Sequence, residues 1–298
     1  EQVLDLELVD RDAIAGADFT VAVDAVNSVG GFAIPELLRA LGVKNIVELN
    51  CDATGRFAHT PEPIPENLTQ ISNLMREGAA DVGFVVDPDV DRLAIVMENG
   101  EMFVEEYTLV AVADYVLQHT PGATVSNLSS SRALRDVTEH HGCTYSAAAV
   151  GEVNVTTKMK ETNAVIGGEG NGGVIYPAAH YGRDALVGVA LFLTLLAKSG
   201  KNVSELKAGY PHYQIVKNKI ELTPAIDVDK LLNSVKERYS NEQVTTIDGV
   251  KIDFADSWVH LRKSNTEPII RIYAEAQTAE KAEALVESIK DVILSMTK

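Results

Sequence analysis

Residues 82–97 read VGFVVDPDVDRLAIVM. The apolar runs 82–86 and 93–97 have the length and β-branched composition of buried strands, and they flank a short acidic turn. Upstream, strand-like runs alternate with helix-like ones, at 19–26, 30–41, 45–49 and 66–78. Alternation of this kind predicts an α/β layer fold.

The rest of the chain adds two further blocks. From about residue 101 the strand–helix alternation repeats, and it ends in a long apolar helix-like segment at 183–198. After Tyr210-Pro211, strand-like runs predominate, and Asp248-Gly249 between two of them indicates a hairpin. The sequence therefore predicts two successive mixed-sheet α/β domains followed by a smaller α+β C-terminal domain.

Composition narrows the classes of function. The 298 residues carry a formal net charge of -17, which disfavours nucleic acids and anionic membranes as partners. An anionic substrate would have to be bound by a few local basic residues. The longest apolar run, 185–197, is shorter than the roughly 20 residues that a membrane-spanning helix needs. The two cysteines, Cys51 and Cys143, form no CxxC pair, so we expect a reducing, cytoplasmic environment.

The acidic turn is the sharpest motif. Asp87, Asp89 and Asp91 alternate between two strands, so their carboxylates can converge on one hard cation such as Mg²⁺. Arg92 would neutralise part of this cluster or reach a phosphate itself. A solvated acidic turn is the plainer interpretation. An EF-hand loop is set aside because Arg92 stands where that loop requires glycine and because strands flank the turn.

A glycine-rich segment, GGEGNGG at residues 167–173, forms the second motif. Its backbone can approach a ligand closely, and Glu169 and Asn171 can hydrogen-bond to vicinal hydroxyls. A simple hairpin turn is the alternative. Nearby, Arg183 and Asp184 open the long helix, where an anion could bind at the helix N-terminus. Asp184 could equally be an ordinary first-turn acid.

The third motif, RKSNTEP at residues 262–268, concentrates anion-binding groups in an acidic chain. Arginine grips phosphate through two parallel hydrogen bonds, and hydroxyl and amide groups add neutral donors. The candidate ligands of a phosphate group are Arg262, Ser264, Asn265, Thr266 and Arg271. A capping box is disfavoured because Pro268 and a strand-like run follow.

These three motifs, in this order, resemble those of the α-D-phosphohexomutase superfamily, and the resemblance covers the whole chain. The GEGNGG form of the glycine loop is most similar to archaeal-type phosphoglucosamine and phosphomannose mutases. The resemblance implies a metal-binding α/β domain at 1–100, a sugar-binding α/β domain at 101–211 and a phosphate-binding domain at 212–298. It implies Mg²⁺ on the three aspartates, and it places Gly172 with Glu169 and Asn171 in the sugar loop.

The implied activity is an intramolecular phosphoryl transfer between O6 and O1 of a hexose, through a hexose bisphosphate intermediate. The substrate would be glucosamine, mannose or glucose phosphate, and the protein a monomer or dimer. Arg92 is the implied catalytic arginine. Arg132 and Glu152 are candidates for the acid/base role, because they stand where related enzymes carry a basic residue and a histidine.

The family's phosphorylated serine lies in a Ser-His-Asn loop of a further domain, and no such tripeptide occurs in these residues. We therefore expect that this first domain is missing and that the fragment by itself is inactive. Two other classes stay open. One is a haloacid-dehalogenase-like phosphatase with Asp87 as nucleophile, and the other is a non-catalytic sugar-phosphate binding protein.

Overall fold

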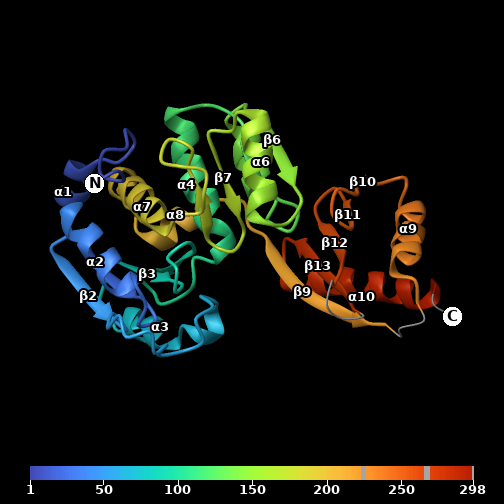
Figure 1. Ribbon diagram of the computed structural model, residues 1–298, viewed down its shortest axis with the longest axis horizontal. Helices are drawn as coiled ribbons and strands as arrows, with labels where there is room; N and C mark the ends of the chain where they lie inside the picture. The colour runs from blue at the N-terminus through green and yellow to red at the C-terminus, as the bar shows by residue number, and fades with distance from the viewer. Residues whose placement is uncertain (223–225, 265–268, 297–298) are drawn as a thin grey trace. The chain divides into compact units, whose positions relative to one another are not determined.

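The computed structural model describes residues 1–222, 226–264 and 269–296. The chain divides into two compact units (Figure 1). The N-terminal unit comprises Glu1–Ala147 and Gly151–Pro211, and the C-terminal unit comprises Ala148–Val150 and His212–Lys298. Each unit is described separately below.

The first sheet of the N-terminal unit has the strand order β2-β1-β3-β4. Strand β1 runs parallel to β2 and β3, whereas β4 pairs antiparallel with β3. The strands are β1 (Thr20–Asp24), β2 (Asn45–Leu49), β3 (Val82–Val86) and β4 (Leu93–Met97). Every residue of β3 and β4 is buried, as their continuous apolar runs predicted. The helices of this part of the chain are α1 (Arg11–Ala17), α2 (Gly30–Ala40) and α3 (Thr69–Arg76).

The second sheet repeats this plan with the order β6-β5-β7-β8, in which β5 and β7 are parallel and β8 is antiparallel to β7. Its strands are β5 (Thr124–Asn127), β6 (Tyr145–Ala148), β7 (Ile166–Glu169) and β8 (Gly173–Ile175). The helices that accompany it are α4 (Glu105–His119), α5 (Ala133–His140), α6 (Glu152–Thr162), α7 (Ala185–Ser199) and α8 (Val203–Ala208).

Helices α4 and α7 hold the two sheets together. Both helices pack against β4 of the first sheet and β8 of the second, and they also pack against each other. On α7, the ring of Phe192 meets Phe84 of β3 and Phe103 edge-on, at centroid distances of 6.2 and 5.4 Å. A helix that serves two sheets must be apolar around its circumference, which explains the long apolar run of α7.

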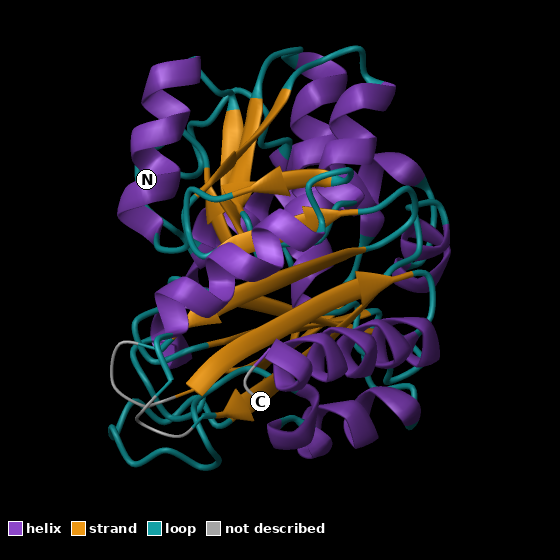
Figure 2. Cartoon of the chain, turned by 90° about the vertical axis from the view of Figure 1, so that its right-hand side faces the viewer, coloured by secondary structure: helices purple, strands orange, loops and turns teal. Residues whose placement is uncertain are grey.

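The C-terminal unit contains an antiparallel sheet of order β10-β11-β12-β13-β9. Helices α9 (Val228–Arg238) and α10 (Ala279–Met296) pack on one face of the sheet around an apolar core (Figure 2). The strands are β9 (Gln214–Glu221), β10 (Gln243–Thr245), β11 (Val250–Asp253), β12 (Trp258–Lys263) and β13 (Ile269–Ala276). The Asp-Gly hairpin joins β10 to β11, as predicted, with Gly249 at φ 65°.

The predicted fold class is confirmed: two mixed-sheet α/β layers precede an α+β unit. The sequence patterns missed the short helices α1 and α8. Short elements give too few periods for a pattern to be recognised. None of the described helices is long and apolar enough to cross a membrane.

Candidate functional site

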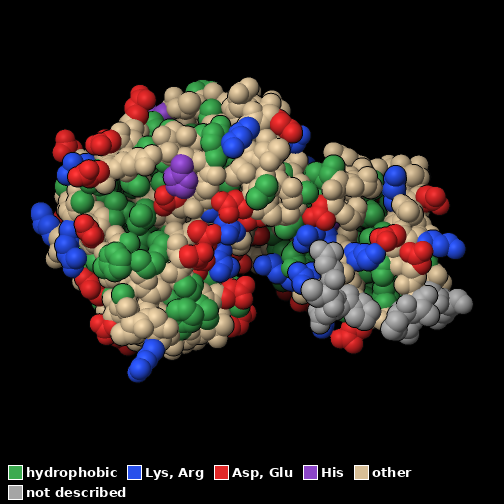
Figure 3. Space-filling model, viewed as in Figure 1, with side chains coloured by type: hydrophobic (Ala, Val, Ile, Leu, Met, Phe, Trp, Pro, Cys, Tyr) green, Lys and Arg blue, Asp and Glu red, His purple; other side chains and the backbone are tan. Residues whose placement is uncertain are grey.

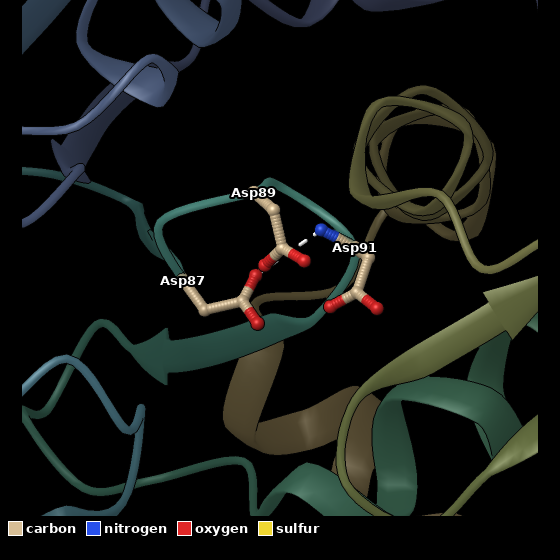
Figure 4. A group of neighbouring side chains, drawn as sticks. All are labelled: Asp87, Asp89 and Asp91. Atoms are coloured by element: carbon tan, nitrogen blue, oxygen red, sulfur yellow. Dashed lines mark hydrogen bonds between the residues drawn. The ribbon is translucent and has the colours of Figure 1, made fainter. Parts of the chain in front are cut away.

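The acidic turn connects β3 to β4, so its carboxylates lie just beyond the carboxyl end of β3. One ligand oxygen from each of Asp87, Asp89 and Asp91 lies within 4.8 Å of the other two. Figure 4 shows the three side chains in this turn, with the Asp91 amide directed at the Asp87 carboxylate. Asp87 is 1% exposed, whereas Asp89 is exposed. A group of carboxylates of this kind fits a hard divalent cation, which prefers oxygen ligands.

Arg92 and the turn backbone fix the position of Asp87. Its Oδ1 accepts hydrogen bonds from the amides of Asp91 and Arg92 at 3.1 and 3.0 Å, and its Oδ2 accepts one from Arg92 Nε at 2.5 Å. Burial acts to raise the pKa of Asp87, but these hydrogen bonds and the Arg92 charge outweigh it, and the pKa is lowered. Burial, together with the neighbouring Asp87, raises the pKa of Asp91 to about 6.

The glycine-rich segment forms the β7–β8 hairpin, so the hairpin interpretation describes its geometry. The turn nevertheless brings polar groups together. Glu169 is 5% exposed, and its Oε1 accepts from Asn127 Nδ2 at 2.8 Å and from the Gly151 amide at 3.2 Å. Asn171 Oδ1 accepts from the Gly173 amide at 3.1 Å, which uses part of its side chain to close the turn.

Gly172 attaches this hairpin to the first sheet. Its carbonyl accepts the Leu93 amide at 3.0 Å, at the first residue of β4 and directly after the acidic turn. Gly172 has φ 91°, and a Cβ built there would lie 2.5 Å from the Leu93 carbonyl oxygen. A glycine is required at this position for both reasons.

Arg183 joins the two loops. Its Nη2 pairs with Asp91 Oδ2 of the acidic turn, and its Nη1 donates to Glu169 Oε2 of the hairpin at 2.7 Å. Glu152, the first residue of α6, accepts the Arg183 amide at 2.9 Å, and its Oε2 lies 3.7 Å from Nε. Burial acts to lower the pKa of Arg183, but the three carboxylates outweigh it and raise that pKa. Arg183 thus brings together Asp91, Glu169 and Glu152, which the sequence had singled out separately.

Three polar residues beside the hairpin were not recognised from the sequence. Asn127 holds Glu169, the Ser130 hydroxyl accepts the Gly170 amide at 2.9 Å, and buried Glu106 accepts the Ser131 amide at 2.8 Å. The sequence did contain a signal for two of these residues, Asn127 and Ser130. The run NLSSS at 127–131 begins at the last residue of the buried strand β5, and polar residues at the carboxyl ends of parallel strands often line sites.

Two other residues that the sequence singled out, Asp184 and Arg132, each lie at the start of a helix. Asp184 is the N-cap of α7: its Oδ1 accepts the Leu186 amide at 2.7 Å, and its Oδ2 lies 2.9 Å from His180 Nε2. Asp184 is thus a capping residue that precedes the first turn, and capping accounts for its contacts with the helix. Arg132 is 5% exposed and lies at the start of α5. A substrate role for Asp184 and a catalytic role for Arg132 remain predictions.

The predicted phosphate-binding residues belong to the C-terminal unit. Arg262 on β12 lies opposite Arg271 on β13, and Arg271 lies opposite Lys219 on β9, so the three basic residues form a row across adjacent strands. Arg262 Nε lies 3.0 Å from Asp248 Oδ2, which also accepts the Val150 amide at 3.0 Å.

Ser264 is buried, and its amide donates to the Ile269 carbonyl at 3.1 Å. The predicted ligands Asn265 and Thr266 lie outside the described residues. Basic side chains gather on the face of the C-terminal unit shown in Figure 3. Arg262, Arg271 and Lys219 therefore form a local group of positive charges in an acidic chain, which suits the binding of an anion.

Models of three consecutive domains of one family match the chain. They are phosphoglucomutase/phosphomannomutase alpha/beta/alpha domain II at residues 2–100, alpha/beta/alpha domain III at 105–213 and the C-terminal domain at 215–292. The chain belongs to the phosphoglucomutase/phosphomannomutase family. The acidic turn, the glycine hairpin and Arg262 each fall within a different one of the three matched domains.

Named relatives agree with this membership. A phosphoglucomutase/phosphomannomutase of Thermococcus kodakarensis is 38% identical over 94% of this chain and 61% of its own length. A phosphoglucosamine/phosphogalactosamine mutase of Sulfurisphaera tokodaii is 34% identical over 97% of this chain and 64% of its own length. The crystal structure of a family protein from Burkholderia thailandensis superposes with a TM-score of 0.82 at 28% identity, covering 96% of this chain and 63% of that one. The chain thus spans less than two thirds of the length of these relatives.

Proposed function

We propose that this chain provides the metal-, sugar- and phosphate-binding parts of a phosphohexose mutase. The enzyme would interconvert hexose 6-phosphate and hexose 1-phosphate through a bisphosphate intermediate. The relatives carry the names of phosphoglucomutases, phosphomannomutases and phosphoglucosamine mutases, which supports this reaction class. For the phosphatase alternative we find no such support.

One observation carries the proposal. The acidic turn and the glycine hairpin belong to different sheets, yet Arg183 contacts a carboxylate of each. A cation site and a group of sugar hydroxyl ligands would then lie one arginine side chain apart. That is the proximity needed to hold a phosphoryl group beside the hydroxyl that receives it.

Asp87, Asp89 and Asp91 would hold Mg²⁺. When bound there, Mg²⁺ would neutralise charge on the transferring phosphoryl group. Arg92 positions Asp87 through two hydrogen bonds, one from its amide and one from Nε, so that the buried carboxylate stays ionised and oriented. Asn171 and Glu169 would read hydroxyl groups of the sugar. Because both Glu169 oxygens already accept hydrogen bonds, its orientation is fixed before a ligand arrives.

In the C-terminal unit, Arg262, Ser264 and Arg271, with Asn265 and Thr266, would grip the phosphate that is not reacting. A single grip of this kind serves both directions of the reaction, because the two ends of the sugar exchange places. We extend the proposal to glucosamine, mannose or glucose phosphate as substrate and to a cytoplasmic location. The two free cysteines are compatible with a reducing compartment.

The activity test is made on this chain and on the complete gene product. Glucosamine, mannose and glucose 6-phosphates are offered with Mg²⁺ and a trace of hexose bisphosphate, and ³¹P NMR follows the 1-phosphates. We expect interconversion of at least one substrate by the complete product and its loss in Asp89→Asn. Release of inorganic phosphate in place of a 1-phosphate would instead favour a phosphatase.

A binding test separates catalysis from recognition. Titration calorimetry of this chain with the same hexose phosphates measures affinity without turnover. Binding without interconversion in the complete product would leave the sugar-phosphate binding protein as the better description.

A further inference from the structure

Arg183 has more acidic neighbours than a simple ion pair requires. Its guanidinium is within ion-pair distance of Asp91, Glu169 and Glu152, which come from the acidic turn, the hairpin and α6. The side chains of Arg183 and Asp91 are both 19% exposed, and that of Glu169 is 6% exposed. Opposite charges that are so little exposed to water attract each other strongly. Like charges brought to the same place would repel each other strongly.

The contact with Asp91 bears directly on metal binding. Arg183 Nη2 pairs with Oδ2 of a carboxylate that belongs to the candidate metal group. A divalent cation on the three aspartates would place two more positive charges beside the guanidinium. Both cations would compete for the charge of Asp91, and Arg183 would bind it less strongly once the metal is present.

Arg183 does not depend on Asp91 to stay in the site. Glu169 Oε2 accepts from Nη1 at 2.7 Å, and Glu152 accepts the Arg183 amide at 2.9 Å. Gly173 has no side chain at a point where a Cβ would meet the Arg183 side chain. Arg183 could therefore leave Asp91 by a small rotation and keep its other contacts.

We propose that Arg183 is an internal counter-ion that occupies Asp91 until a divalent cation binds the acidic turn. In the metal-free protein it replaces part of the missing positive charge and keeps the aspartates together. In the metal-bound protein its Nη2 donor becomes available to an anionic ligand held between the turn and the hairpin. Arg183 is thus a positioning residue that sets the metal affinity, and the inference rests on the proposed metal site.

The test measures binding of Mg²⁺ alone, by titration calorimetry on the whole chain. Removing the competing charge in Arg183→Met should tighten Mg²⁺ binding at least about fivefold, whereas a residue that merely orients Asp91 as a ligand would loosen it when removed. Arg39→Met is the matched control, because it deletes the same charge from an ion pair with Glu48 whose arginine side chain is 62% exposed. We expect its Mg²⁺ affinity to stay within about twofold of wild type.

Arg183→Lys and thermal unfolding provide independent readouts. Lysine keeps the charge but cannot contact two carboxylates through a rigid fork, so its Mg²⁺ affinity should lie between those of wild type and Arg183→Met. Saturating Mg²⁺ should raise the unfolding temperature of the N-terminal unit more in Arg183→Met than in wild type, because the stabilisation by a ligand follows its affinity.

Two failures can be told apart. If wild type binds Mg²⁺ and Arg183→Met binds it equally or more weakly, the counter-ion inference is wrong and the metal site stands. An equal gain in Arg39→Met would also overturn the inference, since the effect would then be one of net charge. If neither wild type nor Arg183→Met binds Mg²⁺, the metal site itself is wrong and the inference falls with it.

Discussion

Gly172 offers a quantitative test of how the hairpin is attached to the first sheet. Replacing it with alanine has two separable costs. The residue has φ 91°, a region that costs a non-glycine residue about 1–2 kcal/mol. The new Cβ would also lie 2.5 Å from the Leu93 carbonyl oxygen and 3.0 Å from the Leu93 amide nitrogen. Relieving that contact by moving backbone costs about 1–3 kcal/mol, as overpacking does.

The same movement weakens the hydrogen bond from the Leu93 amide to the Gly172 carbonyl, worth about 1 kcal/mol. We therefore expect Gly172→Ala to lower the unfolding free energy of the N-terminal unit by about 2–6 kcal/mol. Two control substitutions separate the cost of the positive φ from the cost of the close contact. Gly55 has φ 70° and open space around its Cβ position, so Gly55→Ala should cost only about 1 kcal/mol. Gly16 lies inside α1 with open space and no positive φ, so Gly16→Ala should stabilise by about 0.5–1 kcal/mol.

Hydrogen exchange measured by mass spectrometry resolves the effect by segment. Peptides from β4 and β8 should lose protection in Gly172→Ala, while β9 and β13 of the C-terminal unit should not change. The fluorescence of Trp258, fully buried in the C-terminal unit, provides a second check that this unit is intact. If Gly172→Ala costs no more than Gly55→Ala, the close approach of the hairpin to Leu93 carries no strain, and this account of the attachment is refuted.

Three further predictions concern single residues. Arg262→Ala should weaken glucose 6-phosphate binding at least about tenfold without unfolding the C-terminal unit, and unchanged affinity in titration calorimetry would contradict the phosphate-loop assignment. Burial lowers the pKa of His260 from 6.5 to about 4. The contribution of the neutral His260 side chain to the stability of the fold is therefore fully present above pH 6.5 and is lost as the pH falls towards 4. Unfolding followed by Trp258 fluorescence should show a loss of up to about 3 kcal/mol over that window, and the loss should be absent in His260→Gln. Burial, with Glu48 and Asp24 nearby, raises the pKa of Cys51 to about 12, so iodoacetamide at pH 8 should label it only after denaturation, and rapid labelling of the native chain would show that the thiol is not protected.

Local patterns were sufficient for much of this protein. The β3 and β4 strands were predicted to the residue, because a fully buried strand is a continuous apolar run with clear ends. The acidic turn could be placed between them for the same reason. Asp248-Gly249 predicted its hairpin because the turn needs a residue that accepts a positive φ, which Gly249 supplies. The order of the three motifs was sufficient to suggest the family.

Only the tertiary structure decided which of these parts meet. Arg183 and Asp91 are 92 positions apart, and no local pattern relates them, because their contact depends on how α7 packs across two sheets. Glu106 and Asn127 were missed because a buried polar residue is recognised by its partners, and its partners are distant in the sequence. The sequence determined the elements and the chemistry of each loop, since these depend on neighbouring residues. The folded structure determined that one arginine joins the acidic turn to the hairpin, since that depends on long-range packing.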